Sequence, residues 1–189
     1  MTIDLDRFRP WLVLLARMQL AGRLGAKLDA SDVAQQALLE ACRALPQFRG
    51  STEAELIAWL RSILAGVLAH EVRRYAATQA RDLAREVSLD AELAASSCRL
   101  AHVLADSGPS PSAEAVRHEQ AVRLANALAR LPDDYREVIV LRNLEGLSHE
   151  DVAARMGRAV GAVRMLWMRA LSRLRRELGA EDEPGKPVR

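Results

Sequence analysis

Seven arginines and not one acidic residue lie between Val152 and Arg176, and this run carries the most specific chemistry in the sequence. The forked, permanently charged guanidinium group of arginine binds phosphate oxygens and guanine edges. Arginine makes up 25 of the 27 basic residues, although the net charge of the chain is only +2. The run therefore indicates a local surface that binds a polyanion. A charged helix face that only meets water is the alternative.

Two helices joined by a tight turn are predicted to position these arginines. Ser148 fits an N-cap, and Gly157 supplies the positive φ that a sharp turn requires. The inward residues of the second helix are expected to be Val163, Trp167, Ala170, Leu171 and Leu174. The opposite face, together with the turn, then carries Arg158, Gly161, Ala162, Arg164, Met165, Met168, Arg169 and Arg173. We expect this helix-turn-helix to bind duplex DNA, with Arg164 or Arg169 able to contact guanine.

Helical periodicity extends through the rest of the chain, and we find no convincing run of alternating strand residues. The sequence predicts an all-α fold of two small helical domains. Serine, glycine and proline accumulate towards 107–112, where the periodicity is weak. We therefore predict a helical domain over 1–85, a flexible linker over 86–114, a second helical domain over 115–179 and a polar tail over 180–189.

Other kinds of site find little support in the residue types. Cys42 and Cys98 lie far apart, with no partner at metal-ligand spacing, so neither a metal site nor a disulfide scaffold is expected. The four histidines, His70, His102, His118 and His149, are scattered, and no glycine-rich phosphate loop occurs. We expect no catalysis, no metal and no cofactor. The sequence shows neither a signal peptide nor a membrane span, which predicts a cytoplasmic, nucleoid-associated protein.

Two parts of the sequence resemble, in the right order, two regions of one bacterial family. Residues 131–178, LPDDYREVIVLRNLEGLSHEDVAARMGRAVGAVRMLWMRALSRLRREL, resemble region four of extracytoplasmic-function (ECF) sigma factors of the sigma-70 family. Residues 29–50, DASDVAQQALLEACRALPQFRG, and 58–75, AWLRSILAGVLAHEVRRY, resemble their region two. The resemblance implies a subunit of RNA polymerase that binds core polymerase and directs promoter-specific initiation. Region four would bind the upstream promoter element, and region two would help open the downstream one.

The resemblance also implies where the polymerase binds. In the family, the exposed stripe of the helix near 31–45 contacts the clamp helices of the β′ subunit. Here that stripe consists of Asp32, Gln35, Gln36, Leu39 and Arg43. An exposed Leu39 among polar residues fits an interface anchor, although single exposed apolar residues are common. The helix 135–142 matches the part that docks on the β flap, and the family allows an anti-sigma factor as a further partner.

For the downstream element, the resemblance points to a loop and the helix after it. In the family, such a loop captures an unstacked base, and here it contains Phe48, Arg49, Gly50, Ser51 and Thr52. Phe48 or Arg49 could stack on the base, whereas a core position is the alternative for the Phe48 ring. Trp59 is predicted to be a core residue. On the helix, Gly66, His70, Arg73 and Arg74 complete the predicted DNA-binding set.

This chain departs from the family pattern in two places. Asn and Asp are frequent in the family where Gly66, Val67 and His70 stand here, so readout of the downstream element is expected to differ. Gly66 indicates either close approach of a backbone or sequence drift. In the second helix, Met165, Leu166 and Met168 replace small polar or basic residues. They predict either contacts to thymine methyl groups or a weak sequence preference.

Two other functions compete with the sigma-factor hypothesis. An operator-binding regulator could use the same helix-turn-helix without contacting polymerase, although nothing in the first domain resembles an effector pocket or a dimer helix. A degenerate paralogue could bind polymerase without initiating transcription. An enzyme is the least supported class.

Overall fold

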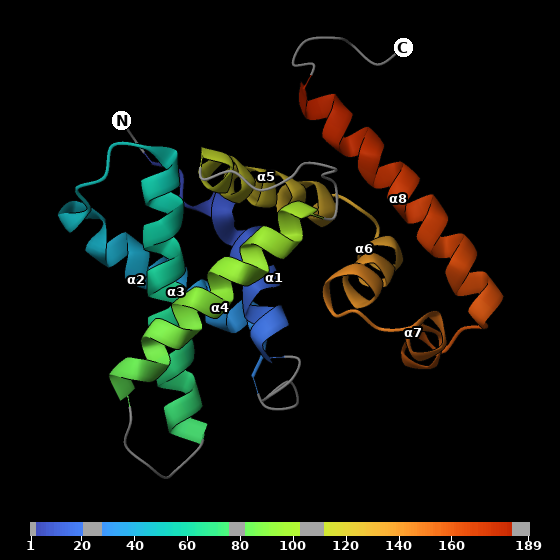
Figure 1. The fold of residues 1–189 in the computed structure, drawn as a ribbon, viewed down its shortest axis with the longest axis horizontal. Coiled ribbons are helices and arrows are strands. Elements are labelled where there is room, and N and C mark those ends of the chain that lie inside the picture. The colour runs from blue at the N-terminus through green and yellow to red at the C-terminus, as the bar shows by residue number, and fades with distance from the viewer. Residues whose placement is uncertain (1–2, 21–27, 76–81, 103–111, 183–189) are drawn as a thin grey trace. The chain divides into compact units, whose positions relative to one another are not determined.

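The computed structural model describes residues 3–20, 28–75, 82–102 and 112–182 of the chain. Within these residues every element is helical, and none is a strand (Figure 1). The chain divides into two compact units, Met1–Val122 and Arg123–Arg189. The predicted all-α class with two helical domains is confirmed.

The first unit is built around one long helix. Its elements are η1 (Asp6–Phe8), α1 (Arg9–Leu20), α2 (Ala30–Ala44), η2 (Leu45–Gln47), α3 (Glu53–Tyr75), α4 (Asp82–His102) and the start of α5 (Ser112–Ala129). The helix α3 packs against both α2 and α4, and α1 packs against the same two helices. Among the fully buried side chains of this unit are Phe8, Trp11, Leu12, Leu15, Ile57, Leu60, Leu64, Leu68, Leu93 and Leu100. Each such side chain contributes about 1.5–3 kcal/mol of apolar burial, which holds α3 in place and leaves one stripe of it accessible.

The prediction of a flexible linker over 86–114 is wrong for 86–102, which lie within α4. Leu89, Leu93 and Leu100 recur at helical spacing and are almost fully buried. The serines at 96 and 97, which weakened the sequence pattern, are buried within the packed helix. Residues 112–114 begin α5, and 103–111 lie outside the described residues. The boundary between the compact units consequently falls inside α5, beyond the predicted linker.

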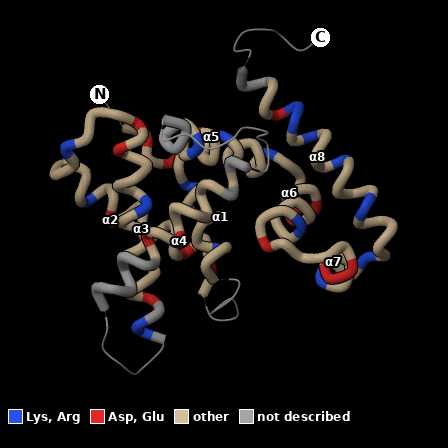
Figure 2. Tube along the Cα trace, in the orientation of Figure 1, with Lys and Arg blue, Asp and Glu red and all other residues tan. Residues whose placement is uncertain are grey.

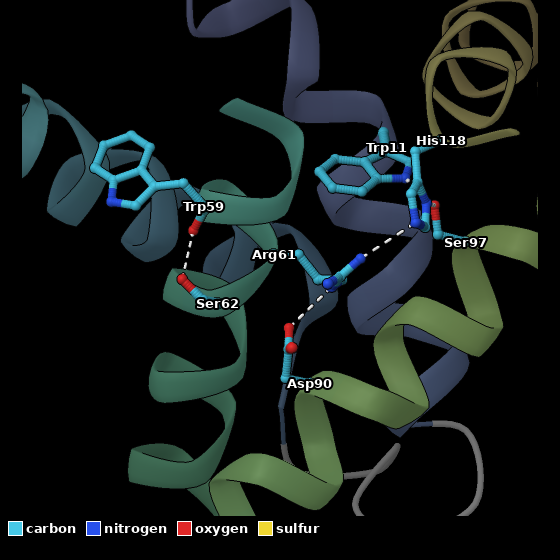
Figure 3. Close-up of polar contacts among 7 residues, drawn as sticks. All are labelled: Trp11, Trp59, Arg61, Ser62, Asp90, Ser97 and His118. Carbon is cyan, nitrogen blue, oxygen red and sulfur yellow. Dashed lines mark hydrogen bonds and ion pairs between the residues drawn. The ribbon is translucent and has the colours of Figure 1, made fainter. Parts of the chain in front are cut away.

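A buried polar network fastens α4 and the start of α5 to the first unit (Figure 3). Trp11 Nε1 donates to Ser97 Oγ at 3.2 Å, and His118 Nδ1 lies 2.9 Å from the same oxygen. Arg61 donates from Nε to Asp90 Oδ1 at 2.9 Å, and its Nη1 lies 3.3 Å from His118 Nε2. A guanidinium group can only donate, so Nε2 must accept and Nδ1–H must donate to Ser97. One serine oxygen thus accepts hydrogen bonds from two other helices.

The structure also defines the ends of two helices. The N-cap of α2 is Asp29, whose carboxylate accepts from Ser31 N at 2.7 Å. At the other end of the chain, α8 continues to Asp182, so the predicted tail over 180–189 begins as helix. Residues 183–189 lie outside the described residues.

The second unit contains the predicted helix-turn-helix. It comprises the end of α5, then α6 (Asp133–Ile139), the π-helical turn η3 (Val140–Leu144), α7 (His149–Met156) and α8 (Val160–Asp182). Ser148 Oγ accepts from Asp151 N at 3.0 Å, and Gly157 has φ +63°, so the predicted cap and turn are both present. The apolar residues of 138–141 are fully or almost fully buried, which confirms that they serve mainly the core of the unit.

Candidate nucleic-acid and polymerase interfaces

The helix α8 has one side fixed in the core and the other open to solvent. Val163, Ala170 and Leu174 are fully buried against α6 and α7, as predicted, whereas Trp167 and Leu171 are half-buried. Trp167 Nε1 donates to Asn143 Oδ1 at 2.9 Å, which further fixes the rotation of the helix. The predicted DNA-binding residues are all exposed: Arg158, Gly161, Ala162, Arg164, Met165, Met168, Arg169 and Arg173. The fold thus gathers this set on one side of α8.

Acidic residues of α6, α7 and α8 itself pair with several arginines of the run. Arg164 Nη2 lies 3.3 Å from Glu150 Oε1, and Arg173 Nη2 lies 2.8 Å from Glu177 Oε1. Arg158 pairs with Asp134. In Figure 2, basic positions recur along the length of α8, while acidic positions cluster on α7. The exposed pairs of Arg158 and Arg164 contribute only about 0–1 kcal/mol each, so a phosphate group can replace either carboxylate at little cost.

The predicted polymerase-binding stripe also forms one continuous surface. Asp32, Gln35, Gln36, Leu39 and Arg43 are all exposed on α2, opposite its buried residues. Leu39 is 47% exposed, one of the few large apolar side chains so open to solvent. Cys42 is exposed beside this stripe. The helix therefore offers an apolar residue framed by polar groups.

The predicted base-capture loop is held in shape by its own side chains. The Phe48 and Trp59 rings lie 4.9 Å apart at 37°, and both are half-buried. Gly50 lies against the Phe48 ring so closely that a Cβ there would fall 2.2 Å from Phe48 Cζ. Glycine is therefore required by a close approach inside the loop. A hollow of about 270 Å³ opens beside the loop, lined by Ile3, Asp4, Arg7, Phe48, Gly50, Ser51, Thr52, Glu53 and Leu56.

Glu55 acts as the internal clamp of this loop. Its Oε2 accepts from Ser51 N at 2.8 Å, from Thr52 N at 3.0 Å and from Thr52 Oγ1 at 3.0 Å. Thr52 Oγ1 in turn accepts from Glu55 N at 3.2 Å, which completes a capping box at the start of α3. The amide donors of Ser51 and then Thr52 stabilise the charged carboxylate and lower the pKa of Glu55.

Trp59 is not the core residue that its apolar neighbours suggested. It is half-buried and lies on the accessible stripe of α3, pointing away from the Arg61 network in Figure 3. At about 100° per residue, Trp59, Ser62, Gly66, His70 and Arg73 fall on the same side of the helix. The predicted DNA-binding residues thus form two groups, the loop at one end of α3 and Gly66 to Arg74 towards the other. Trp59 and Ser62 connect them, a role that helical spacing could have indicated.

A groove of about 510 Å³ lies between α2 and α3. It brings Asp32 and Gln36 of the polymerase stripe together with His70 and Arg74 of the predicted DNA set. From the sequence, two of these residues were predicted to bind polymerase and the other two to bind DNA. In the first unit, the two predicted interfaces are therefore adjacent.

Within the described residues, no group of three or more His, Cys, Asp and Glu side chains could hold a metal ion. Among the described helices, none is both long and apolar enough to cross a membrane.

Comparison with protein families now identifies the two units. The model of sigma-70 region 2 matches residues 5–78, and the model of sigma-70 region 4 matches residues 121–174. Over 179 residues the chain is 33% identical to the ECF RNA polymerase sigma factor SigD of Mycobacterium tuberculosis, covering 95% of this chain and 77% of that protein. The chain belongs to the ECF subgroup of the sigma-70 family. It is an RNA polymerase sigma factor, which directs transcription from promoters.

Further relatives agree with this assignment. RNA polymerase sigma-H factor of Pseudomonas aeruginosa is 36% identical over 143 residues, covering 75% of this chain and 69% of that protein. The ECF sigma-E factor of Escherichia coli is 32% identical over 143 residues, covering 75% and 70%. A solved structure of sigma factor RpoE with the anti-sigma factor NepR from Bartonella quintana aligns at 22% identity, covering 90% of this chain and 91% of that one, with a TM-score of 0.33. A similarity of that degree supports no argument about partners.

The match to region 2 decides against an operator-binding regulator, because such a protein has no use for a polymerase-binding domain. Residues 79–120 match neither family model, yet they contain α4 and the start of α5. The segment between the two conserved regions of this sigma factor is therefore largely structured.

Proposed function

We propose that this sigma factor uses three surfaces, each of which binds a different partner. The stripe around Leu39 on α2 binds the clamp helices of the polymerase β′ subunit. The loop Phe48–Thr52 and the accessible stripe of α3 hold the separated non-template strand of the downstream element. The exposed side of α8 enters the major groove of the upstream element. The chain binds polymerase and promoter DNA and helps to separate the strands, and it catalyses no reaction itself. It acts in the cytoplasm.

The groove between α2 and α3 is the observation that carries this proposal. Asp32 and Gln36 line it from α2, and His70 and Arg74 line it from α3. A clamp helix bound along α2 would therefore lie beside a strand bound along α3. This arrangement allows polymerase binding and strand separation to support each other.

The loop supports capture of an unstacked base. Phe48 and Trp59 present aromatic surface at the loop, and stacking of one base on such a ring is worth about 1–3 kcal/mol. The hollow of about 270 Å³ beside them has apolar walls from Ile3 and Leu56 and hydroxyl groups from Ser51 and Thr52. Those groups suit a flat base with polar edges.

Two further partners are proposed on fewer observations. Docking on the polymerase β flap would involve the outer side of α6 and η3, because their apolar residues are buried. An anti-sigma factor is a family-based proposal, since no surface among the described residues singles it out.

The experiment that tests the polymerase surface compares two exposed apolar residues. Leu39→Glu places a charge at the centre of the α2 stripe and should weaken binding to core polymerase by tenfold or more, as expected for an interface anchor. Val116→Glu is the matched control, because Val116 is 50% exposed and lies on α5, away from the stripe. Equal affinities of the two variants for core polymerase would contradict the proposed surface.

A further inference from the structure

In the N-terminal half of α8, methionines and not arginines occupy the centre of the exposed side, and Ser172 and Arg176 follow there further along the helix. At about 100° per residue, the buried Val163, Ala170 and Leu174 define one side of the helix. Met165 lies within about 20° of the point directly opposite, and Met168 is about 40° from that point. Arg164 and Arg173 lie on the two flanks, each roughly a right angle from the centre.

Both methionine side chains are unusually open for their type. Met165 is 52% exposed and Met168 is 61% exposed. They are three residues apart, so their side chains lie next to each other on the helix surface. Gly161 and Ala162, one turn earlier on the same side, are small enough to let the helix backbone approach a partner closely.

The surrounding charge identifies the partner as a nucleic acid. Arg164 and Arg173 flank the methionines. Arg164 pairs with the exposed carboxylate of Glu150, which a phosphate group can replace, and Arg173 pairs with the half-buried Glu177. Arg169 adds a cation beside Met165 and has no ion-pair partner among the described residues. In a helix lying in the major groove, the flanks meet the phosphate backbones and the centre meets the base edges.

Methionine places an apolar, flexible thioether at those base edges. It cannot donate a hydrogen bond and accepts only weakly, so it cannot read the polar pattern of guanine, adenine or cytosine. The one apolar group in the major groove is the C5-methyl group of thymine. Met165 and Met168 therefore match thymine and no other base.

We propose that Met165 and Met168 select thymines in the upstream promoter element by van der Waals contact with their methyl groups. This proposal rests on the proposed binding of α8 to that element. It assigns sequence preference to the methionines and phosphate contact to Arg164 and Arg173. The arginines then supply affinity without distinguishing one base from another.

Replacement of thymine by deoxyuridine tests the proposal, because it removes the methyl group and keeps the hydrogen-bonding pattern. The full chain is assembled with core polymerase, and its preferred upstream sequence is selected from a randomised duplex library. Each thymine of the selected sequence is then replaced singly by deoxyuridine. We expect one or two positions to lose about fourfold in affinity, the effect of burying one methyl group.

Variants test whether the methionines cause this loss of affinity. In Met165→Ala and Met168→Ala, the loss at the position each contacts should disappear, whereas Met168→Leu should keep most of it. Arg173→Ala is the control: it should weaken every probe by a similar factor and leave the ratio between thymine and deoxyuridine unchanged.

Two results would overturn the proposal while leaving DNA binding by α8 intact. One is tight, sequence-selective binding that deoxyuridine does not weaken at any position. The other is an unchanged deoxyuridine penalty in both alanine variants. If the alanine variants lose affinity for core polymerase instead, the methionines form a protein interface and the proposal is wrong. Failure to select any upstream sequence would contradict the proposed function itself.

Discussion

At the level of single residues, the base-capture loop depends on one glycine and one carboxylate. Gly50 has its α-carbon against the Phe48 ring, which in turn lies on Trp59. Glu55 gathers the amides of Ser51 and Thr52. Neither residue needs to touch DNA, because their effect is to fix the shape of the loop.

Gly50→Ala should disturb this loop directly. The added Cβ would lie 2.2 Å from Phe48 Cζ and 2.7 Å from Phe48 Cε2, so the ring must move away from Trp59. We expect a loss of about 1–3 kcal/mol in the free energy of unfolding and slower promoter opening, with binding of the upstream element unchanged. Denaturant unfolding and the permanganate reactivity of unpaired thymines measure the two effects.

Gly66→Ala is the matched control for stability, because a Cβ at Gly66 would meet nothing within 4 Å. Alanine is the better helix former, so this variant should gain about 1 kcal/mol of stability. If the strand passes close to Gly66 as proposed, promoter opening should nevertheless slow. A variant that is more stable and opens promoters at the normal rate would indicate sequence drift at this position.

Glu55→Gln should make loop stability independent of the carboxylate charge. The Ser51 and Thr52 amides lower the pKa of Glu55 in the folded state below its ordinary value of 4.5. The carboxylate therefore stabilises the fold above about pH 4.5, and this contribution is lost as the pH falls through the lowered pKa. The difference in stability between wild type and Glu55→Gln, measured by urea unfolding, should be constant near neutral pH and shrink in acid. A difference in stability that grows in acid would contradict the proposed role of the Glu55 carboxylate.

Residue by residue, the sequence was most informative where local rules decide the outcome. Ser148, Gly157 and the outward arginines of α8 follow from capping, turn geometry and helical period. The exposure of Trp59 did not follow, because its neighbours are apolar and only tertiary packing decides which side of a helix is covered. The close contact between Gly50 and Phe48 was equally invisible, since it depends on the ring position.

At the level of helices, α4 is the element that sequence analysis missed. No large apolar residue occurs between Leu93 and Leu100, where alanine, serine and cysteine fill most of the interval. The helix is stabilised by packing on α1 and α3 and by the hydrogen bonds of Ser97, neither of which leaves a local pattern. Polar residues that look like linker can thus belong to a packed helix when their partners lie on distant segments.

Ser97→Ala tests whether this packing matters. The substitution leaves the buried Trp11 Nε1–H and His118 Nδ1–H without their acceptor. An unsatisfied buried donor costs about 1–3 kcal/mol, so the midpoint of thermal unfolding should fall by several degrees. Ser62→Ala is the control, because the exposed Ser62 hydroxyl only bonds the Trp59 carbonyl of its own helix, and its effect should be within about 0.5 kcal/mol. Equal effects of the two substitutions would show that the network does not fasten α4.

At the level of the whole molecule, we propose two DNA-binding units that act through one polymerase. The first unit would bind polymerase and the separated strand beside one groove, and the second carries the helix-turn-helix. Family membership establishes the sigma-factor role. What the individual surfaces do is the proposal, and the degenerate-paralogue hypothesis is its sharpest competitor.

Promoter-specific transcription by the reconstituted holoenzyme tests the central claim most directly. The full chain is added to bacterial core polymerase, and run-off transcripts are recorded from a library of promoter fragments. The account predicts discrete transcripts from a subset of fragments, absent with core polymerase alone and lost with Leu39→Glu. Stable binding to core polymerase without any promoter-directed transcript would contradict it.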